Sequence, residues 1–255
     1  MSLTPEQQRQ FYKHGFLHIP GAVPVERVER CRRKIHHSIG SRGMDPSELT
    51  NYRARSYCPE LQNDPDFTQL VRCEVPWQVL NAALGQGNVD VGEWVQIALR
   101  FPTMADDPGP AKWHVDGVPT RDNGAPPDRV SHFTCLLGVV LADVPAPGRG
   151  NLTVWPGGHH KMEQWFRDNP VKKLLEGYPD LDLADPHPTC ARAGDAFMVH
   201  YLTPHGVTPN VGPDPRYMVF FRIKHARHAE FGDDCLTDAW LEWPGVRDVV
   251  EAAPA

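Results

Sequence analysis

The spacing of hydrophobic residues along this chain changes near residue 91. Before that point apolar positions recur three or four residues apart, and the clearest helical stripe is Val25, Val28, Cys31, Ile35 and Ile39. Within residues 94–100 apolar and polar side chains instead alternate, which indicates a β-strand. Gln96 and Arg100 fall on its polar face, which is either half exposed or lines a wet pocket.

Helices are expected in the first third of the chain. Thr4 and Gln7 form a capping box around Pro5, and Gly15 can end that helix. Further expected elements are a short strand at residues 16–20, a helix from Val25 to Gly40, and helical character at residues 67–84 broken at Pro76. The polar segment 42–66 is either part of an active-site rim or an exposed connection.

Short strands dominate the rest of the pattern. They are expected at residues 130–144, 151–155, 196–201 and 216–224, with Gly/Pro turns at 145–148, 156–158 and 212–215. This pattern favours a mainly β fold, a double-stranded β-helix (jelly roll) with packed N-terminal helices. The chain is interpreted as one domain, residues 1–255, with a helical flank (1–90), a jelly-roll core (91–224) and a C-terminal extension (225–255).

Composition narrows the range of partners. Proline (26 residues) and glycine (21) suit many short strands joined by turns, and the net charge of −6 comes without a run of Lys or Arg. Nucleic acid and anionic membrane are therefore not expected as partners. The N-terminus has no signal-peptide pattern, and no apolar run approaches the ~20 residues that cross a bilayer. A cytoplasmic protein is expected.

Cysteine usage fits that location. The six cysteines are scattered and contain no Cys-x-x-Cys pair. They are expected to be free thiols packed as small apolar groups, and a zinc site built on cysteine is not expected.

The strongest chemical signal is His114-Val115-Asp116. Residues two apart on a strand point to one face, so an imidazole and a carboxylate would lie together there. With His205 they would give the two-histidine-one-carboxylate set of non-haem Fe(II) oxygenases, which leaves open positions on the metal. A chain with 13 His and 32 acidic residues produces such triplets by chance, so context matters. The other triplet, 228–230, has no histidine after it and is interpreted as solvated surface.

The surrounding motifs resemble the phytanoyl-CoA dioxygenase family of Fe(II)/2-oxoglutarate oxygenases. The matching segments, in order, are residues 3–7, 15–16, 113–117, 141–144, 151–159, 194–195 and 205–206, followed by Arg216. The resemblance spans most of residues 3–224. Each motif is modest, but their order and spacing together are fairly specific.

This resemblance implies that His114, Asp116 and His205 bind iron and that Arg216 holds the distal carboxylate of 2-oxoglutarate. A guanidinium suits that task because its planar fork matches a carboxylate. Gln96 is a second candidate co-substrate contact, and Arg100 a candidate substrate contact. Fe(II), 2-oxoglutarate and O2 are thus the expected cofactor and co-substrates.

Two features depart from the family pattern. Relatives often carry a hydroxyl residue two positions after the distal histidine, where it supports the arginine. This chain has Val207 there, so either Thr208 or another hydroxyl residue takes that role, or no residue does. The segment 118–129, rich in Pro, Gly and charge, is a candidate lid. Halogenating relatives have a small residue in place of Asp116, so oxidation, most simply hydroxylation, is expected and halogenation is not.

The remaining histidines have structural interpretations. His200 is expected inside a strand, His159 and His160 in a loop, and His36 and His37 at a helix end.

Two alternatives stay open: a cupin-like jelly-roll metalloenzyme that does not use 2-oxoglutarate, and a non-catalytic ligand-binding jelly roll. An acyl-CoA substrate would favour a basic rim that binds its phosphates, and the composition of this acidic chain does not indicate one. A free small metabolite or natural-product intermediate is therefore favoured as the substrate. The sequence does not indicate an oligomeric state.

Overall fold

Two antiparallel sheets form the centre of the computed structural model, which describes residues 3–44, 55–103, 109–121 and 123–252. The larger sheet has the strand order β1-β7-β4-β9-β2, and β3 also pairs with β9. Its strands are β1 (Phe16–Ile19), β2 (Val89–Val91), β3 (Gln96–Arg100), β4 (Cys135–Val140), β7 (Ala196–His200) and β9 (Arg216–His225). The smaller sheet, in the order β6-β5-β8, contains β5 (Leu152–Val154), β6 (His187–Pro188) and β8 (His205–Val207).

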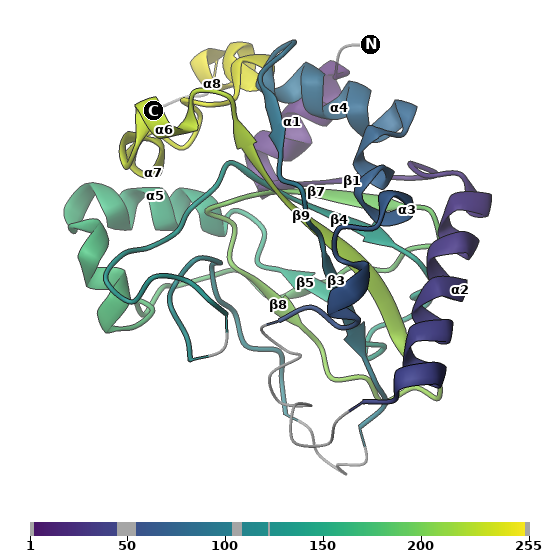
Figure 1. Cartoon of the computed structure of the whole chain (residues 1–255). Coiled ribbons are helices and arrows are strands. Elements are labelled where there is room, and N and C mark those ends of the chain that lie inside the picture. The colour runs from purple at the N-terminus through teal and green to yellow at the C-terminus, as the bar shows by residue number, and fades with distance from the viewer. Residues whose placement is uncertain (1–2, 45–54, 104–108, 122, 253–255) are drawn as a thin grey trace.

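Helices surround these sheets. The α-helices are α1 (Pro5–His14), α2 (Val25–Arg42), α3 (Pro65–Thr68), α4 (Glu74–Leu84), α5 (Gly158–Asp168), α6 (His228–Phe231), α7 (Asp234–Thr237) and α8 (Arg247–Ala252). Short 3-10 helices are η3 (Pro59–Leu61), η4 (Leu70–Arg72), η5 (Val171–Glu176) and η6 (Pro244–Val246). Figure 1 shows α1, α4 and α8 gathered at one end of the sheets and α2 along one side. The expected jelly roll with packed N-terminal helices is therefore confirmed.

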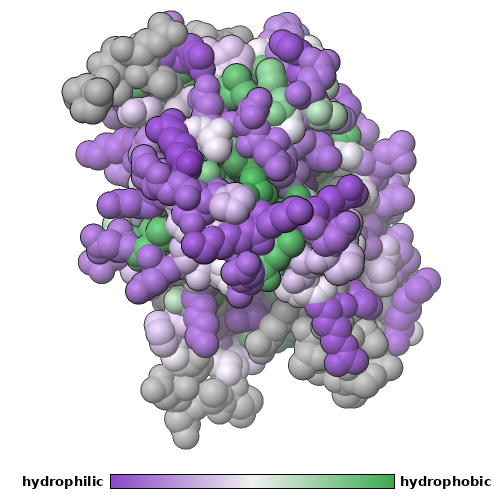
Figure 2. Space-filling model, turned by 90° about the vertical axis from the view of Figure 1, so that its left-hand side faces the viewer, coloured by the Kyte–Doolittle hydropathy of each residue, from purple (hydrophilic) through white to green (hydrophobic). Residues whose placement is uncertain are grey.

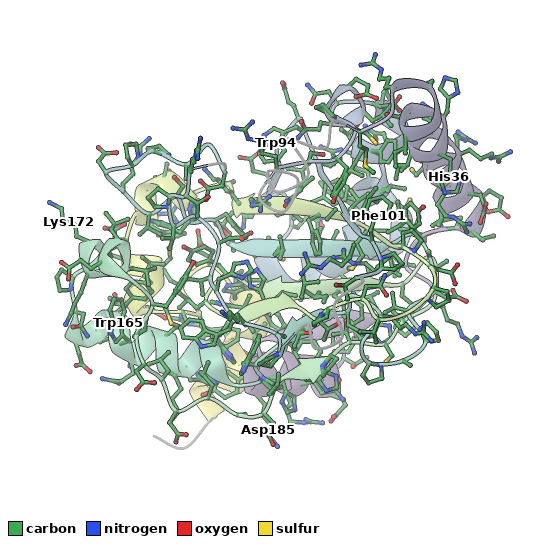
Figure 3. All side chains as sticks on the ribbon, turned by 90° about the horizontal axis from the view of Figure 1, so that it is seen from below. His36, Trp94, Phe101, Trp165, Lys172 and Asp185 are labelled. Atoms are coloured by element: carbon green, nitrogen blue, oxygen red, sulfur yellow. The ribbon has the colours of Figure 1, made fainter. Side chains whose placement is uncertain are left out.

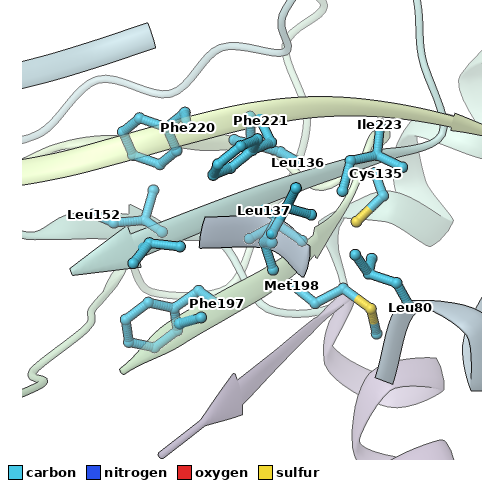
Figure 4. Packing of buried hydrophobic residues seen from close by; sticks show 14 of the residues in the cluster. Leu80, Cys135, Leu136, Leu137, Leu152, Phe197, Met198, Phe220, Phe221 and Ile223 are labelled. Atoms are coloured by element: carbon cyan, nitrogen blue, oxygen red, sulfur yellow. The ribbon is translucent and has the colours of Figure 1, made fainter. Parts of the chain in front are cut away.

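The apolar core lies on the central strands of the larger sheet. All six positions of β4 are buried, since β7 and β9 flank it on both edges. Figure 4 shows Leu137 of β4, Met198 of β7 and Phe221 of β9 packing together beside Leu80 of α4. Burying a side chain of this size contributes roughly 1.5–3 kcal/mol, so the sheet that carries the site is well anchored.

Several local predictions are confirmed. The capping box of Thr4 and Gln7 is present, and Gly15 ends α1 in the left-handed conformation with φ of 75°. In β3 the predicted alternation holds, because Ile97 and Leu99 are buried while Gln96 and Arg100 are only partly buried. The strands at 130–144 and 151–155 are shorter than expected.

Several predictions about helices were wrong. Helix α2 continues past Gly40 to Arg42 and is capped by Gly43, whose φ is 70°. Val25 is 54% exposed, whereas Val28, Cys31 and Ile35 of the same stripe are buried. Pro76 lies in the first turn of α4, where its missing N–H would have no helical partner, so the break comes before it. His159 and His160 lie in α5, not in a loop, and His36 and His37 lie inside α2 rather than at its end.

The prediction of a solvated surface at 228–230 is wrong for His228, which is buried, and confirmed for Ala229 and Glu230, which are exposed. Further along the C-terminal segment 226–252, Trp240 and Trp243 pack against Phe11 of α1 with ring centroids 5.7 and 4.8 Å away. Figure 2 views the side that carries α5–α7 and shows mostly hydrophilic side chains with hydrophobic ones between them. The polar composition of this segment thus describes only its outer face.

No helix in the described part of the chain is both long and apolar enough to span a membrane. The six cysteines are free as expected, and all except Cys190 are buried.

Candidate metal centre and cavity

Three candidate ligand side chains converge beside β8, the edge strand of the smaller sheet: those of His114, Asp116 and His205. One ligand atom from each lies within 4.8 Å of the other two. Asp116 Oδ1 is 3.5 Å from His114 Nε2 and 3.8 Å from His205 Nε2, and the two imidazole centroids are 4.6 Å apart. These separations suit three ligands around one cation.

Backbone pairing places the two histidines side by side. His205 begins β8, and His114 forms an antiparallel bridge to it through two backbone hydrogen bonds of 2.9 Å each. Asp116 lies two residues further along, where the chain has already entered a turn, and its carboxylate still reaches both imidazoles. The three predicted ligands therefore come together, but the extended geometry assumed for His114 and Asp116 was wrong, because the β-bridge is confined to His114.

The orientation of His205 is fixed by its neighbour. Its Nδ1 lies 3.0 Å from the backbone oxygen of Thr203, which can only accept a hydrogen bond. Nδ1 must therefore donate, which leaves Nε2 with a free lone pair on the side of Asp116. That tautomer is the one a metal ligand requires.

Gly206 allows the two ligand-bearing segments to approach closely. A Cβ atom at this position would lie 2.3 Å from the backbone oxygen of Lys112, on the segment that leads to His114. Any larger residue would force the segments apart, so the spacing of the two histidines depends on this glycine.

Arg222 of β9 is a functional residue that the sequence reasoning missed. Its Nε and Nη2 lie 3.1 and 2.9 Å from Asp116 Oδ2, and its Nη2 also donates to Gln96 Oε1 at 3.0 Å. Arg222 therefore occupies the carboxylate oxygen that faces away from the histidines and leaves Oδ1 toward them. Its position six residues after Arg216 puts both on one face of β9, a signal that the sequence contained.

The contacts around Asp116 and His114 shift the pKa values of both side chains. Burial alone would raise the pKa of Asp116, but Arg222 and the two imidazoles hold that pKa well below its usual value. Burial lowers the pKa of His114, an effect only partly offset by Asp116. The pair is thus an anionic carboxylate and a neutral imidazole, the protonation states that coordinate a metal.

Arg216 lies deeper in the same cavity. It begins β9 opposite Arg100 of β3, and its guanidinium donates to the backbone oxygens of Gly150 at 2.8 Å and Ala98 at 3.3 Å. Burial and the nearby Arg100 lower its pKa to about 9, so it stays cationic at neutral pH. Two adjacent guanidiniums in a mostly buried position favour an anionic ligand. Although β8 and β9 belong to different sheets, His205 and Arg216 line the same cavity.

Three further sequence predictions, on Thr208, Gln96 and His200, have a structural outcome. The Thr208 hydroxyl accepts from Asn151 N at 2.8 Å and donates to Asn151 Oδ1 at 3.0 Å, so it is engaged away from Arg216. Gln96 lies four residues from Arg100 along β3 and contacts Arg222, which places it beside Asp116 rather than beside Arg216. His200 is buried in β7 and bonds to Ala239 O at 2.7 Å, as expected for a structural histidine.

The candidate ligands and the arginines open into one cavity of about 1270 Å³. Its lining includes the three candidate ligands, Gln96, Arg100, Arg216 and Arg222. Trp94, 49% exposed, and Tyr178 add aromatic surface at the cavity. Figure 3 labels Trp94, which lines the cavity, and Phe101, which directly follows β3 in the chain.

Both segments predicted to border the site contribute to this lining. From the expected rim, Arg55, Ser56, Pro59, Glu60, Gln62 and Asn63 line the cavity, while residues 45–54 lie outside the described part of the chain. From the candidate lid, Val118, Thr120, Asn123, Gly124, Ala125 and Pro126 line it, and residue 122 lies outside the described part. The rim prediction is thus favoured over an exposed connection for the described residues.

Comparison with known proteins agrees with this geometry. The phytanoyl-CoA dioxygenase (PhyH) family matches residues 11–218. No curated protein matches the chain. Among solved structures, the non-heme alpha ketoglutarate dependent carbocyclase SnoK from nogalamycin biosynthesis is similar, with a TM-score of 0.61, 18% identity and coverage of 87% of this chain and 84% of that one.

Two further structures are similar. HygX from Streptomyces hygroscopicus, with nickel and 2-oxoglutarate bound, has a TM-score of 0.58, 18% identity and 88% coverage of each chain. EvdO2 from Micromonospora carbonacea var. aurantiaca has a TM-score of 0.55, 16% identity and coverage of 88% of this chain and 92% of that one. At these identities the structures support the jelly-roll fold, while the family match spans most of the chain. The chain therefore belongs to the phytanoyl-CoA dioxygenase family of Fe(II)- and 2-oxoglutarate-dependent oxygenases.

Proposed function

We propose that this enzyme oxidises, most simply hydroxylates, an unactivated C–H bond of a small natural-product intermediate. The observation that carries the proposal is the convergence of His114, Asp116 and His205 on the cavity that also contains Arg216. Iron held by these three residues, together with 2-oxoglutarate and dioxygen, would supply the oxidant and leave succinate and carbon dioxide.

The donor set fits ferrous iron. Two imidazoles and one carboxylate are the facial set typical of non-haem Fe(II) oxygenases. The backbone oxygen of Thr203 orients His205, and Arg222 holds the remaining oxygen of Asp116. Such outer-shell contacts keep the ligands in position before the metal arrives.

Arg216 is proposed to bind the distal carboxylate of 2-oxoglutarate. Its backbone contacts to Gly150 and Ala98 fix the guanidinium, and burial strengthens its attraction for an anion. Gln96 is proposed as a lesser contact at the other end of the co-substrate site, where it holds Arg222. Both assignments follow from the placement of these side chains along the cavity wall.

The cavity supports a multi-ring substrate better than a thin acyl chain. Its volume of about 1270 Å³ exceeds the roughly 300–1000 Å³ of common ligand pockets. Trp94 and Tyr178 offer flat apolar faces, while Glu60, Gln62 and Asn63 offer hydrogen-bonding groups. A structure of the similar HygX contains hygromycin B, which supports a natural product as the class of substrate. The absence of nucleic-acid and membrane partners and the cytoplasmic location remain predictions.

Succinate formation tests the proposal. The purified chain, supplied with Fe(II), 2-oxoglutarate and O2, is expected to release succinate, and a metabolite screen should find compounds that stimulate it. Arg216→Ala should raise the KM for 2-oxoglutarate by about 100-fold, as loss of a charged hydrogen-bond partner typically costs 1.5–3 kcal/mol or roughly 10–100-fold. Arg9→Ala, which removes an exposed arginine, is the matched control.

The alternatives give different results. A cupin-like enzyme that does not use 2-oxoglutarate would turn over its substrate without succinate and would tolerate Arg216→Ala. A non-catalytic jelly roll would fail to bind Fe(II) at sub-millimolar concentration.

A further inference from the structure

A second cluster of metal-ligating side chains lies outside the cavity. His132, His228 and Cys235 each offer one ligand atom, and these atoms lie within 4.8 Å of one another. His132 precedes β4, whereas the other two belong to α6 and α7, about a hundred residues later in the chain. His228 and Cys235 are buried, and 11% of the His132 side chain is exposed. None of the three lines the cavity described above.

A carboxylate contacts one nitrogen of each imidazole. Asp233 Oδ1 lies 3.1 Å from His132 Nε2, and Glu242 Oε1 lies 2.7 Å from His228 Nδ1. This leaves His132 Nδ1 and His228 Nε2 to face the thiol. Carboxylates bound to the far nitrogen are the usual outer shell of histidines that ligate zinc, because they fix the ring and raise its basicity.

The distances suit a tetrahedral ion. Typical Zn–N and Zn–S bonds place the nitrogen and sulfur of a tetrahedral site about 3.6 Å apart. His132 Nδ1 and Cys235 Sγ are separated by 3.6 Å. The remaining ligand separations, up to 4.8 Å, need an inward shift of about 1 Å at His228, by the same bond lengths.

The His228 imidazole has a partner at each nitrogen. Its Nδ1 lies 2.7 Å from Glu242 Oε1, and its Nε2 lies 3.1 Å from the backbone oxygen of His132. A neutral imidazole carries one N–H, and when Nδ1 donates it to Glu242 the lone pair on Nε2 is available to a metal ion.

We propose that His132, His228 and Cys235 bind a zinc ion, with water as the fourth ligand. A mixed nitrogen and sulfur donor set favours Zn(II) over Fe(II), and a thiolate with two nearby carboxylates favours a divalent cation. On binding, the Cys235 thiol loses its proton to solvent. The absence of a Cys-x-x-Cys motif made such a site unexpected from the sequence, because its ligands come from segments that only the fold brings together.

The proposed zinc ion joins the C-terminal segment to the core. It would link α6 and α7 to the strand that enters β4, beside Tyr201, whose ring centroid is 6.0 Å from that of His132. Its role is therefore structural, and it does not depend on the proposed oxidation.

Cobalt substitution tests the proposal. One equivalent of Co(II) added to the unmutated chain should produce an intense near-ultraviolet thiolate-to-cobalt band, and Zn(II) should abolish it by displacement. The first centre contains no sulfur ligand and cannot produce this band. Cys235→Ser should remove the band, while Cys190→Ser, which alters an exposed cysteine, should keep it.

A second measurement does not rely on a variant that folds. Zn(II) is expected to slow alkylation of Cys235 in the unmutated chain at least tenfold and to leave Cys190 unaffected, as read by mass spectrometry. Absence of the cobalt band in the folded chain, its persistence in Cys235→Ser, or equal alkylation with and without Zn(II) would each overturn the proposal.

Discussion

The two clusters of metal-ligating residues differ in what surrounds them. His114, with 42% of its side chain exposed, and Asp116 open into a cavity of about 1270 Å³. His228 and Cys235 are enclosed by protein, with a carboxylate behind each imidazole of their cluster. Metal sites that perform catalysis need a position that substrate can reach. The first cluster has that access through the cavity, whereas the second cluster lies outside the cavity lining. The difference fits the chemistry proposed for the first cluster and the structural role proposed for the second.

The largest effect is expected when a ligand is removed from the cluster that lines the cavity (His114, Asp116 and His205), here called the open cluster. His205→Ala should lower iron affinity and succinate formation by at least about 100-fold, because even outer-shell partners typically contribute roughly 10–100-fold. Thermal unfolding should change little. Calorimetric iron titration and a succinate assay measure the first effect, and His37→Ala, at an exposed helix position, is the control. Equal loss of stability and iron binding would remove the distinction between the clusters.

Acid should destabilise the packing of the C-terminal segment, which carries two residues of the closed cluster (His132, His228 and Cys235). Burial lowers the pKa of His200 to about 4, and this residue packs against Trp240 and Trp243 of the C-terminal segment. Because the folded pKa lies below the ordinary value near 6.5, the stabilisation is complete above pH 6.5 and lost as the pH falls toward 4. The change in the free energy of unfolding should be about 3 kcal/mol.

Urea unfolding at several pH values measures this dependence. His200→Asn, which keeps a hydrogen-bonding group but does not titrate in this range, should flatten it. An unchanged pH profile in that variant would show that other groups, such as His159, carry the effect.

Arg222 contacts a ligand of the open cluster, so its removal should affect that cluster alone. Arg222→Ala frees Asp116 Oδ2 and releases Gln96, so the carboxylate loses its fixed orientation. Activity is expected to fall about 10–100-fold, while cobalt binding through a thiolate stays unchanged. Arg222→Lys should recover only part of the activity, since an ammonium lacks the planar fork. Full activity in Arg222→Ala would remove its role in positioning Asp116.

The smallest effect is expected at Tyr201, which lies between the two clusters and contacts a residue of each. The Tyr201 hydroxyl donates to the backbone oxygen of Asp116 at 2.9 Å, and the Tyr201 ring lies near His132. Tyr201→Phe should weaken iron binding by about 1 kcal/mol, the value of one hydrogen bond. Any influence of Zn(II) on iron affinity should disappear in this variant. Persistence of that influence would mean that another path connects the two regions.

The sequence predicted the parts of the molecule that depend on local patterns. The cap at Thr4 and the alternation in β3 follow from neighbouring residues. His114 and Asp116 do come together as predicted, although a turn at Asp116 replaces the expected strand. The division into a flank, core and extension remains a prediction.

What the sequence did not predict depends on contacts between distant segments. The turn predicted at 156–158 is present at Pro156 and Gly157, but the sequence did not reveal that α5 follows it directly, with Gly158 packed against Pro204. His228 looked exposed because its neighbours are polar, yet Glu242 and the His132 backbone enclose it. Arg222 carried a signal, its shared face with Arg216, but only the fold shows which carboxylate it meets.

Because Gly206 has no side chain, it limits which substitutions this site can accept. The gap between the two ligand-bearing segments is as narrow as two peptide backbones allow, because a single methyl group there would overlap the Lys112 carbonyl. Diversification of this enzyme toward new substrates is therefore expected in the surrounding loops, since substitution at this point would separate the histidines. The cavity wall can vary, but the distance between these two strands cannot.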